Sequence, residues 1–222
     1  MKKFYSDARC EIKVQPFAPV LNLEYAVTDN IDLKKYNLPE KYFIICNQFW
    51  QHKNHITAFR AMLKMIREGN EDVYMVCTGH KDDYRLKSFN RRLREWLDEN
   101  ELMDKIIFTG YIPKLDQIEM MKNSIALVQP TLFEGDPGGC AVYDAVSMGI
   151  RVILSDIDVN LELDGTEDCY FFRKKDSDDL YRKMMEISSA PKFKYSEEKA
   201  MQKRIVNLKK QADFWGKIVN LD

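Results

Sequence analysis

Residue types suited to binding chemistry gather in residues 129–140, between a predicted strand and a predicted helix. Gly138 and Gly139 stand at the start of that helix, where backbone N–H groups can approach an anion without a side chain in the way and the helix dipole attracts negative charge. Glu134 precedes the glycines and Asp144 follows them by one turn, so both carboxylates can face one ligand. Carboxylates accept strong hydrogen bonds from sugar hydroxyls. The pattern predicts a site for an anionic, hydroxyl-bearing ligand; the alternative is a tight turn with two solvated acids.

A second loop, residues 47–55, also follows a predicted strand and precedes a predicted helix. Lys53 arrives just before the helix, where an ammonium can hold a phosphate together with backbone amides. The alternative is a solvated lysine beside aromatic side chains that only pack.

Other reactive residues fit known sites poorly. His52, His55 and His80 lack the helical spacing and the acidic partner of a zinc protease, so no metal site is expected. Cys140 could be a nucleophile activated by the helix dipole, but no His or Asn lies nearby in the sequence, and we expect a small packing residue. Cys46 and Cys77 fall in predicted strands and should be inert. The sequence lacks the phosphate-binding loop G-x-x-x-x-G-K-[ST], the dinucleotide-binding loop G-x-G-x-x-G and the serine-hydrolase motif G-x-S-x-G.

The elements that must position these loops alternate along the chain. Strands are expected at 42–46, 73–77, 106–109, 124–129, 151–154 and 169–172. Helices are expected after an Asn54 cap, around 89–97, and at 115–122, 141–148 and 176–187. Strands that are apolar on both faces and alternate with helices predict an α/β fold, a doubly wound Rossmann-like parallel sheet of about six strands. Ligands bind such sheets beyond the carboxyl ends of the strands, which is where both loops lie.

The two ends of the chain differ from this pattern. Residues 1–35 contain one strand-like stretch, 11–14, and prolines interrupt much of the rest. Residues 196–219 predict a long amphipathic helix, capped by Ser196. This helix either packs across its own sheet or reaches another domain.

Composition limits the classes of partner. The 222 residues carry 34 Lys plus Arg and 35 Asp plus Glu, a net charge of −1, which gives no overall attraction to nucleic acid. No apolar run has the length of a membrane span, and the amino terminus lacks a secretory pattern. Five widely spaced cysteines without a C-x-x-C pair indicate reduced thiols and a cytoplasmic protein.

Four segments together form a recognisable pattern, in this order along the chain: 47–55 (NQFWQHKNH), 108–112 (FTGYI), 129–135 (QPTLFEG) and 143–156 (YDAVSMGIRVILSD). In these segments and their order, residues from about 40 to about 190 resemble the C-terminal, donor-binding domain of retaining family 4 (group 1) glycosyltransferases, which have the GT-B fold.

The resemblance implies a role for each matching residue. Lys53 would contact the donor diphosphate and Glu134 the hydroxyls of the donor sugar, and these two would be the catalytic pair. Asp144 would bind the ribose. The base would meet the main chain of Gly110, Tyr111 and Ile112, and the phosphate and sugar would meet the amides of Gly138, Gly139 and Cys140. No metal or cofactor is implied, because cations and the helix dipole neutralise the leaving diphosphate.

Two departures from the family pattern concern the site. The family has an Arg about five residues before the Lys, and here Gln48, or Asn47 in a shifted loop, takes that position. The paired acids of the family are two glutamates with seven residues between them, whereas nine residues separate Glu134 from Asp144. A deoxysugar donor such as a rhamnose is compatible with this change.

The resemblance also divides the chain. Residues 1–35 would be linker and extension from a missing N-terminal domain, 36–194 the nucleotide-sugar domain, and 195–222 a helix that crosses back to the missing domain. We expect the chain to be the C-terminal half of a glycosyltransferase that transfers a hexosyl or deoxyhexosyl group to a glycan or lipid acceptor, and to be inactive alone. Polysaccharide biosynthesis at the inner face of the membrane, with peripheral association of the full-length protein, is compatible with this. The alternatives are a non-catalytic nucleotide or sugar-phosphate binding module and an α/β interaction scaffold.

Overall fold

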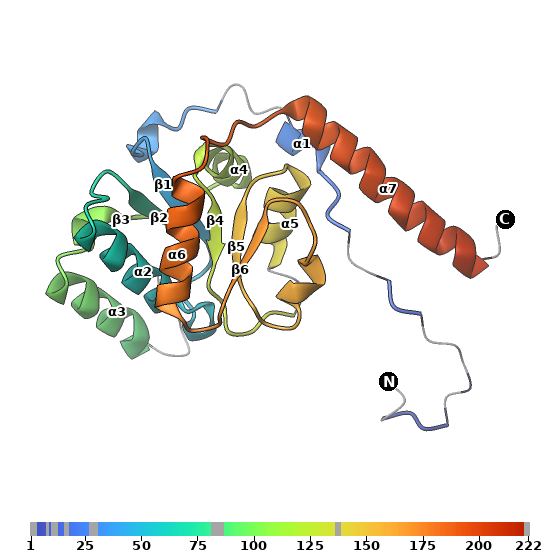
Figure 1. The fold of residues 1–222 in the computed structure, drawn as a ribbon, viewed down its shortest axis with the longest axis horizontal. Helices are drawn as coiled ribbons and strands as arrows, with labels where there is room; N and C mark the ends of the chain where they lie inside the picture. Colours follow the sequence, from blue (N-terminus) through green and yellow to red (C-terminus); the bar gives the residue numbers. More distant parts are fainter. Residues whose placement is uncertain are drawn as a thin grey trace.

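The sheet predicted from the sequence is present in the computed structural model, which describes residues 4–7, 9, 13–15, 18–26, 31–80, 87–135 and 139–219 (Figure 1). Six parallel strands have the order β3-β2-β1-β4-β5-β6. Their bounds are β1 Tyr42–Cys46, β2 Tyr74–Thr78, β3 Ile106–Gly110, β4 Leu127–Gln129, β5 Val152–Ser155 and β6 Cys169–Phe172. Strands β2 and β3 are added on one side of β1, whereas β4, β5 and β6 are added on its other side. Ligands of such sheets bind at this change of side, beyond the carboxyl ends of β1 and β4.

The predicted strands are confirmed with small shifts at their ends. The largest shift is in β4, which was expected from residue 124 and begins at Leu127. Ser124 is still bonded to the end of the preceding helix, since both its N–H and its hydroxyl donate to the Met121 carbonyl. The short apolar strands are buried because both faces of the sheet are covered.

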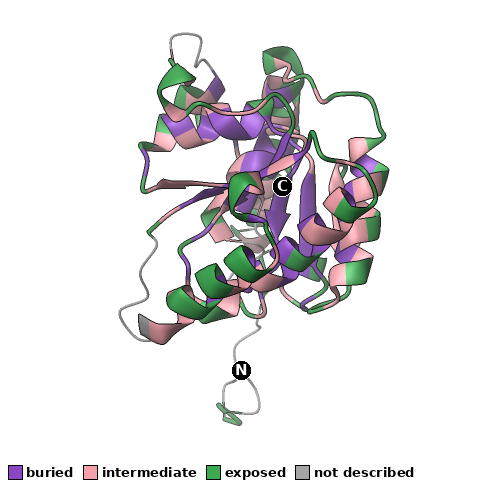
Figure 2. Ribbon diagram, turned by 90° about the vertical axis from the view of Figure 1, so that its left-hand side faces the viewer, coloured by how far each residue is buried: buried purple, intermediate pink, exposed green. Residues whose placement is uncertain are grey.

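Helices cover the sheet on both faces, as the buried strands between exposed helix surfaces show (Figure 2). The main helices are α2 His55–Arg67, α3 Lys87–Glu99, α4 Lys114–Asn123, α5 Gly139–Ser147, α6 Ser177–Ser188 and α7 Glu197–Val219. Shorter turns are α1 Leu23–Ala26, η1 Lys34–Tyr36, η2 Gln51–Lys53, η3 Met103–Lys105 and η4 Asn160–Leu163. Phe43 and Ile45 of β1 pack with α2, α3 and α6, whereas Tyr42 and Ile44 pack with α4, α5 and the start of α7. Successive side chains of a strand point to opposite faces, so β1 joins both cores.

Asn54 stands at the predicted N-cap position of α2, but the predicted side-chain cap is wrong. Asn54 precedes the helix but makes no side-chain cap bond, and its backbone is left-handed with φ of 54°. Its Nδ2 donates to the Pro130 carbonyl at 2.9 Å, and its Oδ1 accepts from Thr57 at 3.1 Å. Asn54 therefore ties the loop after β1 to the loop after β4.

The last helix packs against the domain along its first half. Arg204 and Asn207 of α7 donate to the carbonyls of Leu21 and Pro19, each at 2.7 Å. Farther along, Trp215 is 51% and Val219 55% exposed, and this part of α7 extends away from the sheet in Figure 1. Ile205 and Val206, 49% and 50% exposed, show that apolar side chains also reach solvent beside these contacts. The helix thus packs on its own domain near its start and presents apolar side chains to solvent along its length.

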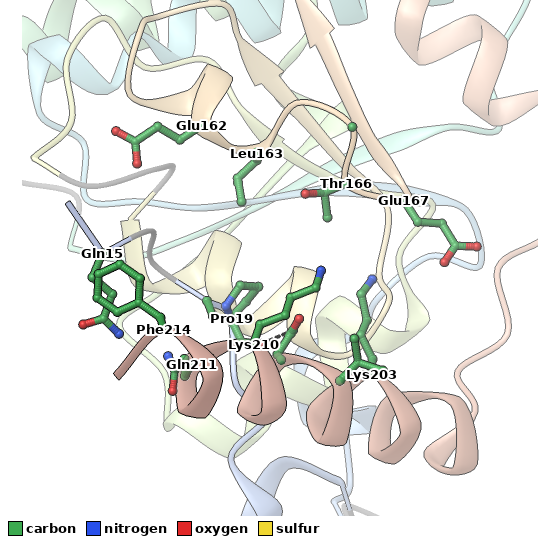
Figure 3. Close-up of a pocket in the computed structure, with 14 residues that line it drawn as sticks. Gln15, Pro19, Glu162, Leu163, Thr166, Glu167, Lys203, Lys210, Gln211 and Phe214 are labelled. Atoms are coloured by element: carbon green, nitrogen blue, oxygen red, sulfur yellow. Dashed lines mark hydrogen bonds between the residues drawn. The ribbon is translucent and has the colours of Figure 1, made fainter. Parts of the chain in front are cut away.

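A cavity of about 430 Å³ lies between α7, the segment before α1 and the loop around Thr166. Lys203 and Lys210 extend from α7 toward that loop (Figure 3). Of the strand expected at 11–14, residues 11 and 12 lie outside the described residues, and Lys13 and Val14 are irregular. In the described ranges, no helix has both the length and the apolarity needed to cross a membrane.

Candidate functional site

The loops after β1 and β4 bring Lys53 and Glu134 into direct contact. Lys53 Nζ lies 2.6 Å from Glu134 Oε1 and 2.9 Å from Oε2. The side chains are 14% and 7% exposed, so this ion pair is largely withdrawn from water. The resemblance assigned both residues to one donor site, and the structure shows them in direct contact. The alternative of a solvated Lys53 is wrong.

Two buried amides extend this contact into the sheet. Gln129, the last residue of β4, donates from Nε2 to Glu134 Oε1 at 3.0 Å. Its Oε1 accepts from Asn47 Nδ2, just after β1, at 2.6 Å. Gln129 had no predicted role, and Asn47 was expected only as an alternative position for the family's Arg. A polar residue directly after each of two neighbouring parallel strands was the available signal.

The amino end of α5 lies beside the carboxylate. A Cβ built on Gly139, whose φ is +71°, would lie 3.8 Å from Glu134 Oε2 and 4.0 Å from Gln129 Nε2. The first amides of a helix are unpaired within the helix and carry positive potential. Gly138 lies outside the described residues. Cys140 is exposed in the first turn, so its predicted packing role is wrong.

Asp144 has a different cationic partner. Its Oδ2 lies 2.5 Å from Nζ of Lys114, the first residue of α4. Lys114 also donates to Gln117 at 3.0 Å, and Gln117 donates to Thr78 at the end of β2 at 3.0 Å. Each predicted carboxylate therefore has its own lysine. The sequence analysis did not single out Lys114, although a lysine that opens a helix after a strand is a recognisable signal.

The segment after β3 forms another wall of the same edge. The Gly110 carbonyl accepts from Gly79 N–H at 2.8 Å. Tyr111 is 76% exposed and stacks on His80, with ring centroids 5.1 Å apart, while Ile112 is buried. A Cβ on Gly79 would meet the Asn47 carbonyl oxygen at 2.5 Å, so the loops after β1 and β2 touch through backbone. Gln48 is exposed.

Each of the three histidines contacts a different aromatic ring, and two of these pairs are stacked. His52 lies against Trp50, His80 against Tyr111, and His55 against Phe49 at 4.1 Å. Burial, with a smaller effect of the Lys53 charge, lowers the pKa of His55 to about 3.

The cysteines of the strands have little thiolate character. Burial raises the pKa of the Cys46 thiol to about 12 and also raises the pKa of Cys77. This supports the expectation that both are inert, since the thiolate is the reactive form.

Comparison with known proteins gives a family and a fold. The family model for glycosyl transferases group 1 matches residues 29–207. A search of curated proteins gives no match.

Solved structures agree in architecture. A glycosyltransferase from Rickettsia africae ESF-5 aligns with a TM-score of 0.68 at 19% identity, over 90% of this chain and 56% of that one. HepE from Anabaena, in complex with UDP and glucose, aligns at 0.63 and 11% identity, over 82% and 48%. The C-terminal domain of a group 1 glycosyltransferase, LpcC, from Francisella tularensis aligns at 0.64 and 20% identity, over 90% and 98%.

This chain thus spans about half the length of the Rickettsia and Anabaena proteins and nearly all of the separate Francisella domain. The family match extends over the β1, β3 and β4 loops that build the site, as well as the six strands. The chain therefore belongs to the group 1 glycosyltransferases and has the Rossmann-like α/β fold of the GT-B enzymes.

Proposed function

We propose that this chain binds a nucleotide diphospho-sugar and, as the C-terminal half of a two-domain family 4 enzyme, takes part in retaining transfer of the sugar to a glycan or lipid acceptor. The observation that carries the proposal is the buried Lys53–Glu134 pair beside the amino end of α5. That arrangement offers a cation and helix amides to a diphosphate and a carboxylate to sugar hydroxyls, within one small volume.

We assign the ribose and the base of the nucleotide to residues along the same edge of the sheet. Asp144, one turn into α5, would accept hydrogen bonds from the ribose hydroxyls, with Lys114 alongside. The base would contact the main chain of Gly110, Tyr111 and Ile112, where the Gly110 carbonyl also accepts from the Gly79 N–H. UDP and UDP-glucose complexes of HepE support this class of ligand.

Transfer breaks the bond between the anomeric carbon and the diphosphate and forms one to the acceptor oxygen. The leaving diphosphate gains charge in that step, so Lys53 and the α5 amides stabilise the transition state more than the ground state. The proposed mechanism uses no bound metal ion or cofactor. It does need a facing wall that positions the acceptor and excludes water.

A second domain preceding this one would supply that wall. The exposed apolar positions of α7 support such a neighbour, as does the family member from Rickettsia, of which this chain covers only 56%. We place the full-length enzyme in the cytoplasm at the inner face of the membrane, where lipid-linked acceptors are reached.

Calorimetric titration tests the proposal. The chain is titrated with UDP, GDP, ADP and dTDP and with their hexose derivatives, with and without a chelator, and incubated samples are analysed for released sugar. We expect weak binding of one nucleotide family that the chelator does not change, without transfer. No binding to any nucleotide would contradict the proposal and favour an interaction scaffold. Metal-dependent binding would contradict the role given to Lys53 and α5, and transfer by the chain alone would contradict the two-domain account.

A further inference from the structure

Gln129 is a buried polar side chain in the centre of the site, at the end of β4. Only 1% of the residue is exposed, although it carries an amide that needs both donors and an acceptor. Burial of such a group is costly unless it is hydrogen-bonded. Its two ends are bonded to different loops, to Asn47 after β1 and to Glu134 after β4.

The Glu134 carboxylate determines which end of the Gln129 amide faces it. An ionised carboxylate only accepts hydrogen bonds, so the Gln129 NH₂ group lies on its side, where a flipped amide would present oxygen to oxygen. Gln129 Oε1 then faces Asn47, whose Nδ2 donates to it at 2.6 Å. Asn47 is itself 7% exposed, and its backbone carbonyl lies too close to Gly79 for a Cβ to fit there. The second anchor of the Gln129 amide is therefore a buried side chain on a closely packed backbone.

The contact between Lys53 and Glu134 should differ between the empty and the donor-bound site. In the proposed function, which this inference extends, Lys53 turns part of its hydrogen bonding toward the diphosphate when the donor binds. Gln129 is neutral and anchored to β4, so it can keep its bond to Glu134 Oε1 while Lys53 changes partners. We propose that Gln129, anchored by its bond to Asn47, is a positioning residue that holds the Glu134 carboxylate for recognition of the donor sugar.

The test separates the sugar from the nucleotide. Dissociation constants are measured for UDP and UDP-glucose, and for the GDP, ADP and dTDP pairs, with the wild-type chain and with Gln129→Leu. Loss of a hydrogen bond to a charged group should weaken the nucleotide sugar about tenfold, while the nucleoside diphosphate changes little. Asn207→Leu is the matched control, because Asn207 is also a buried amide with a bond to a carbonyl, but it lies on α7. It should lose stability and keep the affinity ratio of the two ligands.

A double-mutant cycle shows whether Gln129 acts through Glu134. In a Glu134→Ala background, Gln129→Leu should have no further effect on the nucleotide sugar, since the group to be positioned is gone. An equal loss for both ligands in Gln129→Leu, an unchanged ratio, or full additivity in the cycle would overturn the inference and leave the proposed function standing. A wild-type chain that binds no nucleotide would overturn the proposed function and this inference with it.

Discussion

Replacing Lys53 with methionine should affect stability and binding together. The substitution keeps an unbranched side chain, one heavy atom shorter, and removes the ammonium that contacts both Glu134 oxygens, at 2.6 and 2.9 Å. Removing one partner of a fully buried ion pair costs about 3–5 kcal/mol, and an exposed pair contributes about 0–1 kcal/mol. Lys53 is 14% exposed and Gln129 still donates to Glu134, so we expect the free energy of unfolding to fall by about 2 kcal/mol.

Binding should weaken for a separate reason. A charge-assisted hydrogen bond to phosphate contributes about 1.5–3 kcal/mol, so affinity for a nucleoside diphosphate should fall roughly tenfold to a hundredfold. Urea unfolding measures the first effect and calorimetry the second. Lys183→Met provides the control, because Lys183 and Glu186 form an ion pair on α6 at 2.9 Å whose side chains are 34% and 57% exposed.

The control should lose less than about 0.5 kcal/mol and bind the nucleotide like the wild type. If Lys53→Met is as stable as Lys183→Met, the argument from burial is refuted. If its nucleotide affinity is that of the wild type, Lys53 does not belong to the diphosphate site, whatever its effect on stability.

Three further outcomes are expected from the same site. Asp144→Asn should weaken nucleotides more than pyrophosphate, as measured by calorimetry; equal losses would make Asp144 a structural acid. Below about pH 6.5 an unfolded histidine gains a proton, while folded His55, with a pKa of about 3, stays neutral. The free energy of unfolding should therefore fall by up to about 1.4 kcal/mol for each pH unit below 6.5. His55→Phe should remove this part of the pH dependence, as measured by urea unfolding at several pH values. Gln48→Arg, which restores the family's cation at an exposed position, should tighten nucleoside diphosphate binding about threefold or more; unchanged affinity would show that this position does not face the diphosphate.

The sheet could be predicted from the sequence because its strands are buried on both faces. Continuous apolar runs such as 42–46 and 169–172 have few other places in a protein, and their alternation with amphipathic helices specifies parallel crossovers. The resemblance assigned Lys53 and Glu134 to one site, and the observed strand order places the loops after β1 and β4 side by side. Their direct contact required coordinates.

What the sequence did not predict were partnerships between residues far apart in the chain. Lys114 meets Asp144 only because α4 and α5 cover the same face of the sheet. Asn54 looked like a helix cap, since asparagine is favoured there. A left-handed backbone and the nearby Pro130 carbonyl gave its side chain a tertiary partner instead. The Lys114–Asp144 and Asn54–Pro130 contacts both depend on tertiary structure, and for Asn54 the tertiary contact replaces the helix cap that local preference predicts.

The charge balance of the site bears on how tightly this chain can bind. The two lysine–carboxylate pairs contribute no net charge between them, and Gln48 or Asn47 is neutral where the resemblance leads us to expect an arginine. In the proposed function, a diphosphate would therefore draw Lys53 away from Glu134 and depend on the amides of α5 for the rest of its neutralisation. Helix amides provide only about half an elementary charge, so a donor bound to this chain alone would keep part of its charge unmatched. A facing domain that contributes a cation would complete the site at the moment it closes, which couples tight donor binding to the presence of the acceptor wall.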